Sequence, residues 1–257
     1  MSGRLADRIA VVTGAGTGLG AAIAEALARE GAHVAVHYRG SLAGAEQTAA
    51  RVRELGREAE IFQGDISSWE DVQRLAAEIV ARFGRVDVLV NNVGDMAADQ
   101  TSWRDLQPER IDHMLAVDVK GTLLMTHEFG RRMLDDQQSG AIVNIGSRVV
   151  VEGSPRAPQY AAAKYAIVGI TKSYAHALAP HVRVNTLGPG FVETEALRNR
   201  EDWRTGRREA VLARTPLARI PQPADIVPPV VFLACDDSRH ITGAFLLCDG
   251  GHSMVGA

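Results

Sequence analysis

Three residues of the chain, Ser147, Tyr160 and Lys164, are of types and at spacings that suit proton transfer. Tyr160 and Lys164 stand four residues apart in an alanine-rich segment that is predicted to be helical, so their side chains share one helix face. A free tyrosine loses its proton near pH 10, and proton exchange near neutral pH therefore needs about 4 kcal/mol of stabilisation. The lysine ammonium can supply much of it. Ser147 follows a short apolar run and offers a hydroxyl, so the three residues predict acid–base chemistry at an oxygen atom.

The rest of the chain alternates between short apolar runs and helical patterns. Strands that are apolar throughout indicate a parallel sheet covered on both faces, and we expect one doubly wound Rossmann-type α/β domain spanning residues 1–257. Ligands of such sheets bind beyond the carboxyl ends of the strands. Pro228 and Pro229 predict a shortened or kinked start of the last helix. The seven expected strands are 9–13, 33–38, 59–63, 86–90, 141–145, 182–186 and 245–248, and the helices are 19–29, 45–55, 72–83, 108–134, 159–179 and 224–234.

A glycine-rich stretch, TGAGTGLG, follows the first expected strand and is a second candidate site. Its glycines, Gly14, Gly18 and Gly20, let the backbone approach an anion closely. A helix that begins near Gly18 directs free N–H groups and a positive dipole end at that anion. Thr17 and Leu19 lie in the same turn. The pattern predicts a pyrophosphate site, and a plain tight turn is the alternative.

The serine, the Tyr-x-x-x-Lys pair and the T-G-x-x-x-G-x-G turn together resemble the classical short-chain dehydrogenase/reductase family, and within it the 3-oxoacyl-thioester reductases. The resemblance implies an NAD(P)-dependent enzyme that interconverts a ketone and a secondary alcohol by hydride transfer. It implies that Tyr160 is the general acid and base, and that Ser147 hydrogen-bonds the substrate oxygen. Lys164 is expected to hold the nicotinamide ribose and to stabilise the tyrosine phenolate.

The resemblance covers nearly the whole chain and implies further cofactor residues. In the family, an aspartate after the third strand receives the adenine amino group, and the next residue packs beside the ring. An asparagine-rich stretch after the fourth strand supports the ribose, and a Pro-Gly turn after the sixth contacts the nicotinamide. The matching residues here are Asp65, Ile66, Asn92, Gly94, Pro189, Gly190, Val192 and Thr194.

The end of the second expected strand bears on which dinucleotide is bound. Enzymes that prefer NAD usually carry an acidic residue there, which bonds the ribose 2′-hydroxyl. This chain has Tyr38 followed by Arg39, and Ser41 adds a hydroxyl donor. Because no carboxylate repels a 2′-phosphate and a guanidinium can bind it, we expect NADP(H) to be preferred over NAD(H). The alternative is a solvated Arg39 and an enzyme that accepts both cofactors.

One position departs from the family pattern. Where relatives have asparagine in a V-N-x-x-G context, this chain has Asp118. The family asparagine holds a local break in its helix and, through its backbone carbonyl, a water linked to the lysine. A carboxylate near Lys164 would favour the ammonium and oppose the phenolate, moving the working pH upward unless it points away. Asp118 is therefore included among the catalytic candidates.

The segment 191–214 is long enough to form a lid over a substrate, and a solvated helix of mixed charge is the other interpretation. The substrate itself is open. A 3-oxoacyl thioester follows from the general resemblance, and sugars or cyclic alcohols are alternatives. An alternative from another functional class is a regulator that binds NADP and keeps the fold but does not catalyse a reaction.

Composition excludes several other classes of protein. The formal net charge of −3 gives no reason to expect a nucleic-acid partner. Two cysteines are too few for a disulfide framework, and no apolar run suggests a signal core or a membrane span. We therefore expect a cytoplasmic enzyme with a small-molecule substrate and no metal. The family resemblance adds a homo-oligomer, most commonly a tetramer.

Overall fold

The computed structural model describes residues 3–94, 102–136 and 139–254. Its centre is a seven-stranded sheet in the order β3-β2-β1-β4-β5-β6-β7, with every neighbouring pair parallel. The predicted doubly wound fold is confirmed. The strands are β1 (Ile9–Val12), β2 (His33–Tyr38), β3 (Ala59–Gln63), β4 (Val88–Asn91), β5 (Gly140–Ile145), β6 (Val182–Pro189) and β7 (Phe245–Cys248).

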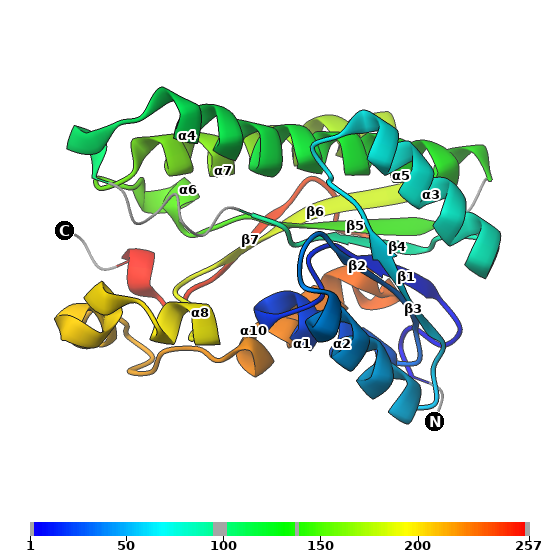
Figure 1. Ribbon diagram of the computed structural model, residues 1–257, viewed down its shortest axis with the longest axis horizontal. Coiled ribbons are helices and arrows are strands. Elements are labelled where there is room, and N and C mark those ends of the chain that lie inside the picture. The colour runs from blue at the N-terminus through cyan, green and yellow to red at the C-terminus, as the bar shows by residue number, and fades with distance from the viewer. Residues whose placement is uncertain (1–2, 95–101, 137–138, 255–257) are drawn as a thin grey trace.

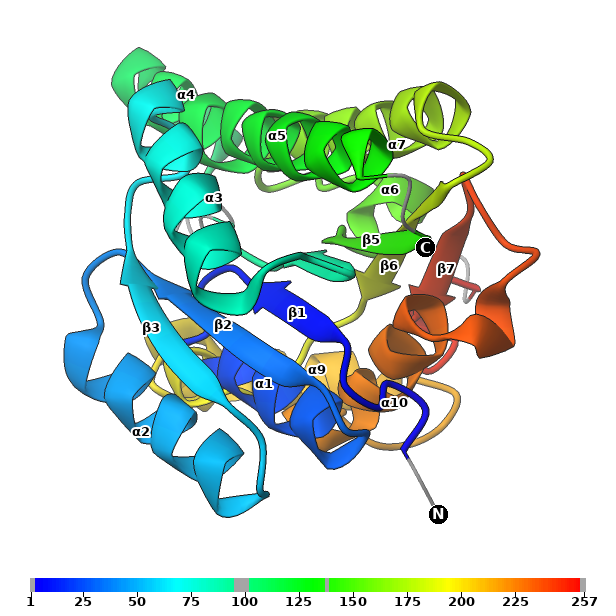
Figure 2. The same cartoon turned by 90° about the vertical axis from the view of Figure 1, so that its right-hand side faces the viewer.

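Helices cover both faces of the sheet (Figures 1 and 2). One face packs against α1, α2 and α10, and the other against α3, α5 and α7. The strands are apolar throughout because both faces are covered: in β1, Val12 belongs to the first core and Val11 to the second. These helices are α1 (Gly18–Arg29), α2 (Leu42–Glu54), α3 (Trp69–Phe83), α5 (Thr122–Asp135), α7 (Pro158–Ala177) and α10 (Pro223–Ala234).

The helical region predicted at 108–134 is divided into three parts. Helix α4 (Pro108–Met114) leads into a π-helical turn, Leu115–Gly121, which is followed by α5. The wider turn carries Asp118, which is fully buried. The local break that the family resemblance implied at this residue is therefore present, although the residue is an aspartate.

The expectation of a shortened or kinked start for α10 is wrong. The helix runs unbroken through Pro228 and Pro229. Its start is fixed one turn earlier, where the Asp225 carboxylate accepts a 2.8 Å hydrogen bond from the Gln222 N–H and Pro223 occupies the first turn.

The segment 191–214 is not one solvated helix of mixed charge. It forms α8 (Glu195–Arg198), a short π-type turn and α9 (Arg208–Ala213), because the backbone leaves the helical conformation at Thr205 and Gly206. Trp203 packs in a small separate core. Within the described residues, no helix is long and apolar enough to cross a membrane, and no group of three His, Cys, Asp or Glu side chains could hold a metal ion.

Candidate active site

A cavity of about 620 Å³ opens at the carboxyl ends of the strands, where β1 and β4 lie side by side and the chain crosses from one half of the sheet to the other. This is the switch point at which doubly wound sheets bind ligands. Most of the predicted site residues line it: Gly14, Thr17, Gly18, Leu19, Gly20, Asn92, Gly94, Ser147, Tyr160, Lys164, Pro189, Gly190, Val192 and Thr194.

The three proton-transfer candidates come from two elements and meet in this cavity. Ser147 lies two residues after the end of β5 and is 8% exposed. Tyr160 and Lys164 lie on the first turns of α7, which begins with Pro158 at its first position. The Lys164 ammonium lies 5.6 Å from the centre of the Tyr160 ring. The helix spacing therefore brings the phenol and the ammonium together as predicted.

Asp118 does not line the cavity but forms an ion pair with the same lysine. Its Oδ2 lies 2.9 Å from the Lys164 Nζ, and both side chains are almost completely buried. A Cβ on Gly94 would stand 3.0 Å from this ammonium and 3.3 Å from the carboxylate. The ion pair therefore packs closely against Gly94, where a side chain would leave it too little room. The carboxylate does not point away from the lysine, and the ion pair is part of the site.

The glycine turn forms a cradle that fits an anion. Gly14 and Gly18 have φ angles of +64° and +58°, a conformation that favours glycine. A Cβ on Gly20 would lie 2.2 Å from the Gly14 carbonyl oxygen, so the turn can be this tight only with glycine. Helix α1 starts at Gly18 and points its amino end into the cavity. Free backbone N–H groups and the helix dipole suit the pyrophosphate of a dinucleotide.

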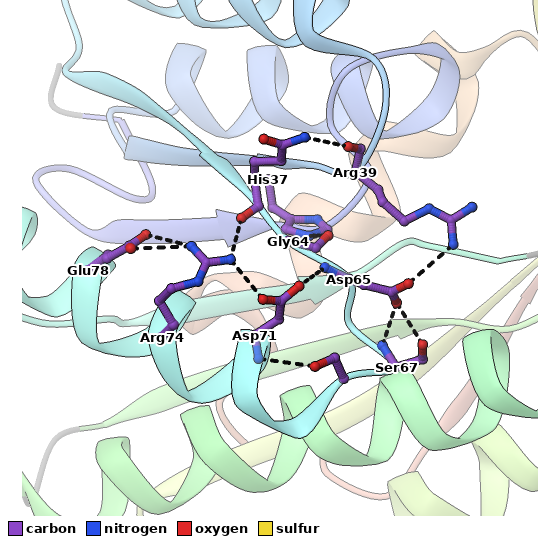
Figure 3. Close-up of polar contacts among 10 residues, drawn as sticks. His37, Arg39, Gly64, Asp65, Ser67, Asp71, Arg74 and Glu78 are labelled. Carbon is purple, nitrogen blue, oxygen red and sulfur yellow. Dashed lines mark hydrogen bonds and ion pairs between the residues drawn. The ribbon is translucent and has the colours of Figure 1, made fainter.

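The predicted adenine end lies beyond the cavity, at the ends of β2 and β3 (Figure 3). The Arg39 guanidinium is 60% exposed and lies 3.5 Å from the Asp65 carboxylate. Burial raises the pKa of Asp65, but hydrogen bonds from Ser67 and the nearby Arg39 outweigh it and leave the pKa below its usual range. Ser41 packs against Gly16 of the glycine turn.

Two of the predicted cofactor residues outside the cavity, Tyr38 and Ile66, have buried side chains. Tyr38 is 8% exposed and belongs to the core under α1 and α2. Ile66 is 4% exposed and packs where a Cβ on Gly121 would stand. The contact of Ile66 with an adenine ring stays a prediction. At the second-strand position, the exposed group that can meet a ribose phosphate is Arg39.

His37 is a residue that the sequence reasoning missed. It is 1% exposed near the end of β2, and its Nδ1 accepts a 3.2 Å hydrogen bond from the Gly14 N–H. Its Nε2 lies 3.1 Å from the Gly64 carbonyl oxygen. Burial lowers the pKa of His37 to about 4, although the Gly64 carbonyl and the carboxylates of Asp65 and Asp71 act in the opposite direction. The ring is therefore neutral in the folded protein near neutral pH.

This burial predicts a loss of stability in acid. The unfolded chain protonates His37 as the pH falls below about 6.5, whereas the folded protein keeps it neutral down to about pH 4. The free energy of unfolding is unaffected above pH 6.5 and should fall by about 3 kcal/mol between pH 6.5 and 4 because of this group. Urea unfolding at pH 7 and pH 4 should show that His37→Asn loses about 3 kcal/mol less than the wild type. Equal losses in both proteins would contradict the assignment.

Known proteins provide an independent comparison. A solved structure assigned as a short-chain alcohol dehydrogenase, from Sinorhizobium meliloti 1021, superposes with a TM-score of 0.92 at 33% identity, covering 98% of each chain. The family model described as enoyl-(acyl carrier protein) reductase matches residues 14–253. The chain belongs to the short-chain dehydrogenase/reductase family. Like other members of this family, it is an oxidoreductase that acts on a CH–OH or ketone group.

Two curated members of the family carry different activities in their names. The 3-oxoacyl-[acyl-carrier-protein] reductase of Staphylococcus aureus strain Mu50 is 36% identical over 246 residues, which cover 95% of this chain and 98% of the relative. The L-rhamnose 1-dehydrogenase (NAD(P)(+)) of Sphingomonas strain SKA58 is 34% identical over 249 residues, 96% of each chain. The chain is thus similar to family members that act on unlike substrates.

The cavity wall also contains residues that the sequence reasoning missed. Arg148 directly follows Ser147, forms an ion pair with Glu152 and stacks 4.2 Å over the Phe191 ring. Asn199 and Arg200, from the segment 191–214, also line the cavity. The position of Arg148 next to the candidate Ser147 was a usable signal, because both residues line the same cavity.

Proposed function

We propose that the protein is an NADP(H)-dependent oxidoreductase that interconverts a ketone and a secondary alcohol, with Tyr160 as the general acid and base. The observation that carries the proposal is that Ser147, Tyr160 and Lys164 line the same cavity as the glycine turn. Bound there, the nicotinamide supplies the transferable hydride. The alternative of a non-catalytic NADP-binding regulator is disfavoured because all three proton-transfer residues are present and face this cavity.

Each residue has a distinct role in this proposal. The Tyr160 hydroxyl gives its proton to the carbonyl oxygen in reduction and takes it back in oxidation. The Ser147 hydroxyl donates a hydrogen bond to the same oxygen as negative charge develops on it. The Lys164 ammonium stabilises the tyrosine phenolate and binds the nicotinamide ribose. Asp118, 2.9 Å from that ammonium, positions Lys164 and reduces its effect on the phenolate.

The preference for NADP(H) is proposed from Arg39. Arg39→Ala should raise the Kd for NADPH about tenfold or more and leave the Kd for NADH nearly unchanged, because it removes a charged partner of the 2′-phosphate. Arg51→Ala is a matched control, since Arg51 is also exposed and also pairs with one carboxylate, Glu25, on the neighbouring helix. An unchanged ratio of the two Kd values in Arg39→Ala would defeat the assignment.

A 3-oxoacyl thioester is the leading substrate class, supported by the similarity to a 3-oxoacyl reductase. A sugar or cyclic alcohol is the second candidate, because a sugar dehydrogenase is similar to nearly the same degree and Arg148, Asn199 and Arg200 place polar groups on the cavity wall. NADPH oxidation should be measured with 3-oxoacyl thioesters, cyclic ketones, quinones and sugar lactones, and NADP reduction with the matching alcohols. Turnover confined to sugars would replace the leading class with the second.

A homo-oligomer is also proposed, on the basis of apolar side chains left exposed on the outer helices. Leu115 and Leu123 are each 40% exposed and Tyr165 is 50% exposed. By contrast, Ile167 and Ile170 of the same region face the core. Light scattering of the purified chain should give a mass several times 27.6 kDa, and a monomer at micromolar concentration would refute this part.

A further inference from the structure

His37 joins two parts of the predicted cofactor site that are far apart in sequence. On one side of β2 its Nδ1 accepts from the N–H of Gly14, the first glycine of the pyrophosphate turn. On the other side its Nε2 meets the carbonyl oxygen of Gly64, the residue before Asp65 (Figure 3). One side chain therefore contacts both the segment expected to receive the pyrophosphate and the segment expected to receive the adenine.

The two contacts define the tautomer of the ring. The partner of Nδ1 is a backbone N–H, which can only donate, so Nδ1 must be the nitrogen without a hydrogen. Nε2 then carries the hydrogen and donates it to the Gly64 carbonyl oxygen. Both nitrogens are used by the neutral ring, and an imidazolium would direct a second donor at the Gly14 N–H.

Backbone hydrogen bonds fix the same two segments to β2. The Ala15 N–H donates to the His37 carbonyl oxygen at 2.9 Å, and the Gly64 N–H donates to the Tyr38 carbonyl oxygen at 3.1 Å. The side chain of His37 therefore adds one further bond on each side at the point where both segments leave the sheet. Without it, the Gly14 N–H would lose its acceptor in a partly buried turn that must hold a positive φ at this glycine.

The charged groups around the imidazole belong to the same end of the sheet. Asp65 lies beyond Gly64, and its N–H donates to the Asp71 carboxylate at 2.7 Å. Arg74 of α3 pairs with Asp71 at 3.0 Å, and Arg39 approaches Asp65 from the end of β2 (Figure 3). These contacts fix Asp65 relative to α3. His37 links the preceding residue, Gly64, to the glycine turn.

We propose that His37 is a positioning residue for the dinucleotide, which sets the glycine turn and the Gly64–Asp65 segment at the separation that the cofactor requires. The inference rests on the proposed function, because it takes the ligand of these two segments to be NADP(H). It assigns His37 no contact with the reacting atoms. Its loss should weaken cofactor binding and leave the maximal rate at saturating cofactor nearly unchanged.

The chain contains a matched control on the same strand. His33, at the opposite end of β2, also accepts a backbone hydrogen bond at Nδ1, from the Glu58 N–H at 2.9 Å. It is far from the carboxyl ends of the strands and does not line the cavity. Substitution of His33 therefore removes the same kind of bond between β2 and the segment that leads into β3, without touching a cofactor segment.

Substitution of His37 by Asn or by Gln retains one of its two hydrogen bonds and removes the other. The Asn Oδ1 stands at the place of Nδ1 and can accept from Gly14, whereas the Gln side-chain end stands nearer the place of Nε2 and can reach only Gly64. The Kd of the full-length protein for NADPH should be measured by equilibrium fluorescence titration. Because each variant loses one of the two bonds, we expect His37→Gln and His37→Asn each to raise it about tenfold or more, and His33→Gln to match the wild type.

Two further readouts distinguish positioning from general damage. Amide hydrogen exchange should be faster at Gly14 in His37→Gln than in His37→Asn, with the central strand β4 equally protected in both. The kcat at saturating NADPH should stay within about twofold of the wild type in both variants. A Kd within about threefold of the wild type in either His37 variant would overturn the inference. If the wild type binds neither NADPH nor NADH, the proposed function itself fails, which is a different result.

Discussion

Tyr160→Phe should lower kcat by about 10²- to 10⁴-fold in both directions of the reaction, which is the usual contribution of a positioned general acid or base. The substitution removes the hydroxyl that exchanges the proton and keeps the ring that lies 5.6 Å from the Lys164 ammonium. The fold and the glycine turn are untouched, so the Kd for NADPH should change less than about threefold. Steady-state kinetics and fluorescence titration of the same preparation measure both quantities.

Tyr165→Phe is the matched control for this experiment. Tyr165 is the next tyrosine on α7, is 50% exposed and does not line the cavity. It should retain the wild-type kcat. If Tyr160→Phe also retained it, the proton would have to come from another group, and the mechanism proposed here would be refuted.

Asp118→Asn should move the pH–rate profile of alcohol oxidation toward lower pH by about one unit or more. In the proposed mechanism, oxidation needs the phenolate of Tyr160, which the Lys164 ammonium stabilises. In the wild type, the carboxylate 2.9 Å from that ammonium offsets part of its positive charge. Removal of the negative charge leaves the ammonium fully effective, so the phenolate forms at lower pH and oxidation rises earlier. For reduction, which needs the protonated tyrosine, the fall in rate at high pH should also begin earlier.

The amide retains the shape of Asp118 and an oxygen that can accept from the lysine. Asp112→Asn removes an exposed carboxylate from the preceding helix and should leave the profile unchanged. An unaltered profile together with an unaltered maximal rate in Asp118→Asn would mean that this aspartate is only a structural substitute for the family asparagine.

The positions of the strands could be predicted because apolar runs report burial directly. The expected strands 33–38, 59–63 and 245–248 coincide with β2, β3 and β7. The Tyr160–Lys164 pair was equally accessible, since a helix places residues four apart on one face whatever surrounds it. Both inferences depend on local geometry alone.

Contacts that depend on the order of strands were beyond such reasoning. His37 reaches Gly14 and Gly64 only because β2 lies between β1 and β3, and nothing in its neighbouring residues indicates this. The distance between Asp118 and Lys164 depends on the π-helical turn that carries Asp118. A π-helical turn directs its side chains differently from a regular α-helix, and the sequence pattern did not indicate one. In the segment 191–214, Trp203 belongs to a small separate core, whereas the charge spacing had left a solvated helix open as one interpretation.

The central claim is that this cavity transfers hydrogen from NADPH to a carbonyl carbon. The most direct test is a reduction with NADPH deuterated at both C4 positions, in ordinary water, on the first ketone or 3-oxoacyl thioester that is turned over. Mass spectrometry should find one deuterium on the carbinol carbon of the product. If NADPH is consumed and the alcohol carries no deuterium, or if NADPH binds and no carbonyl compound of the panel is reduced, the proposed reaction is contradicted.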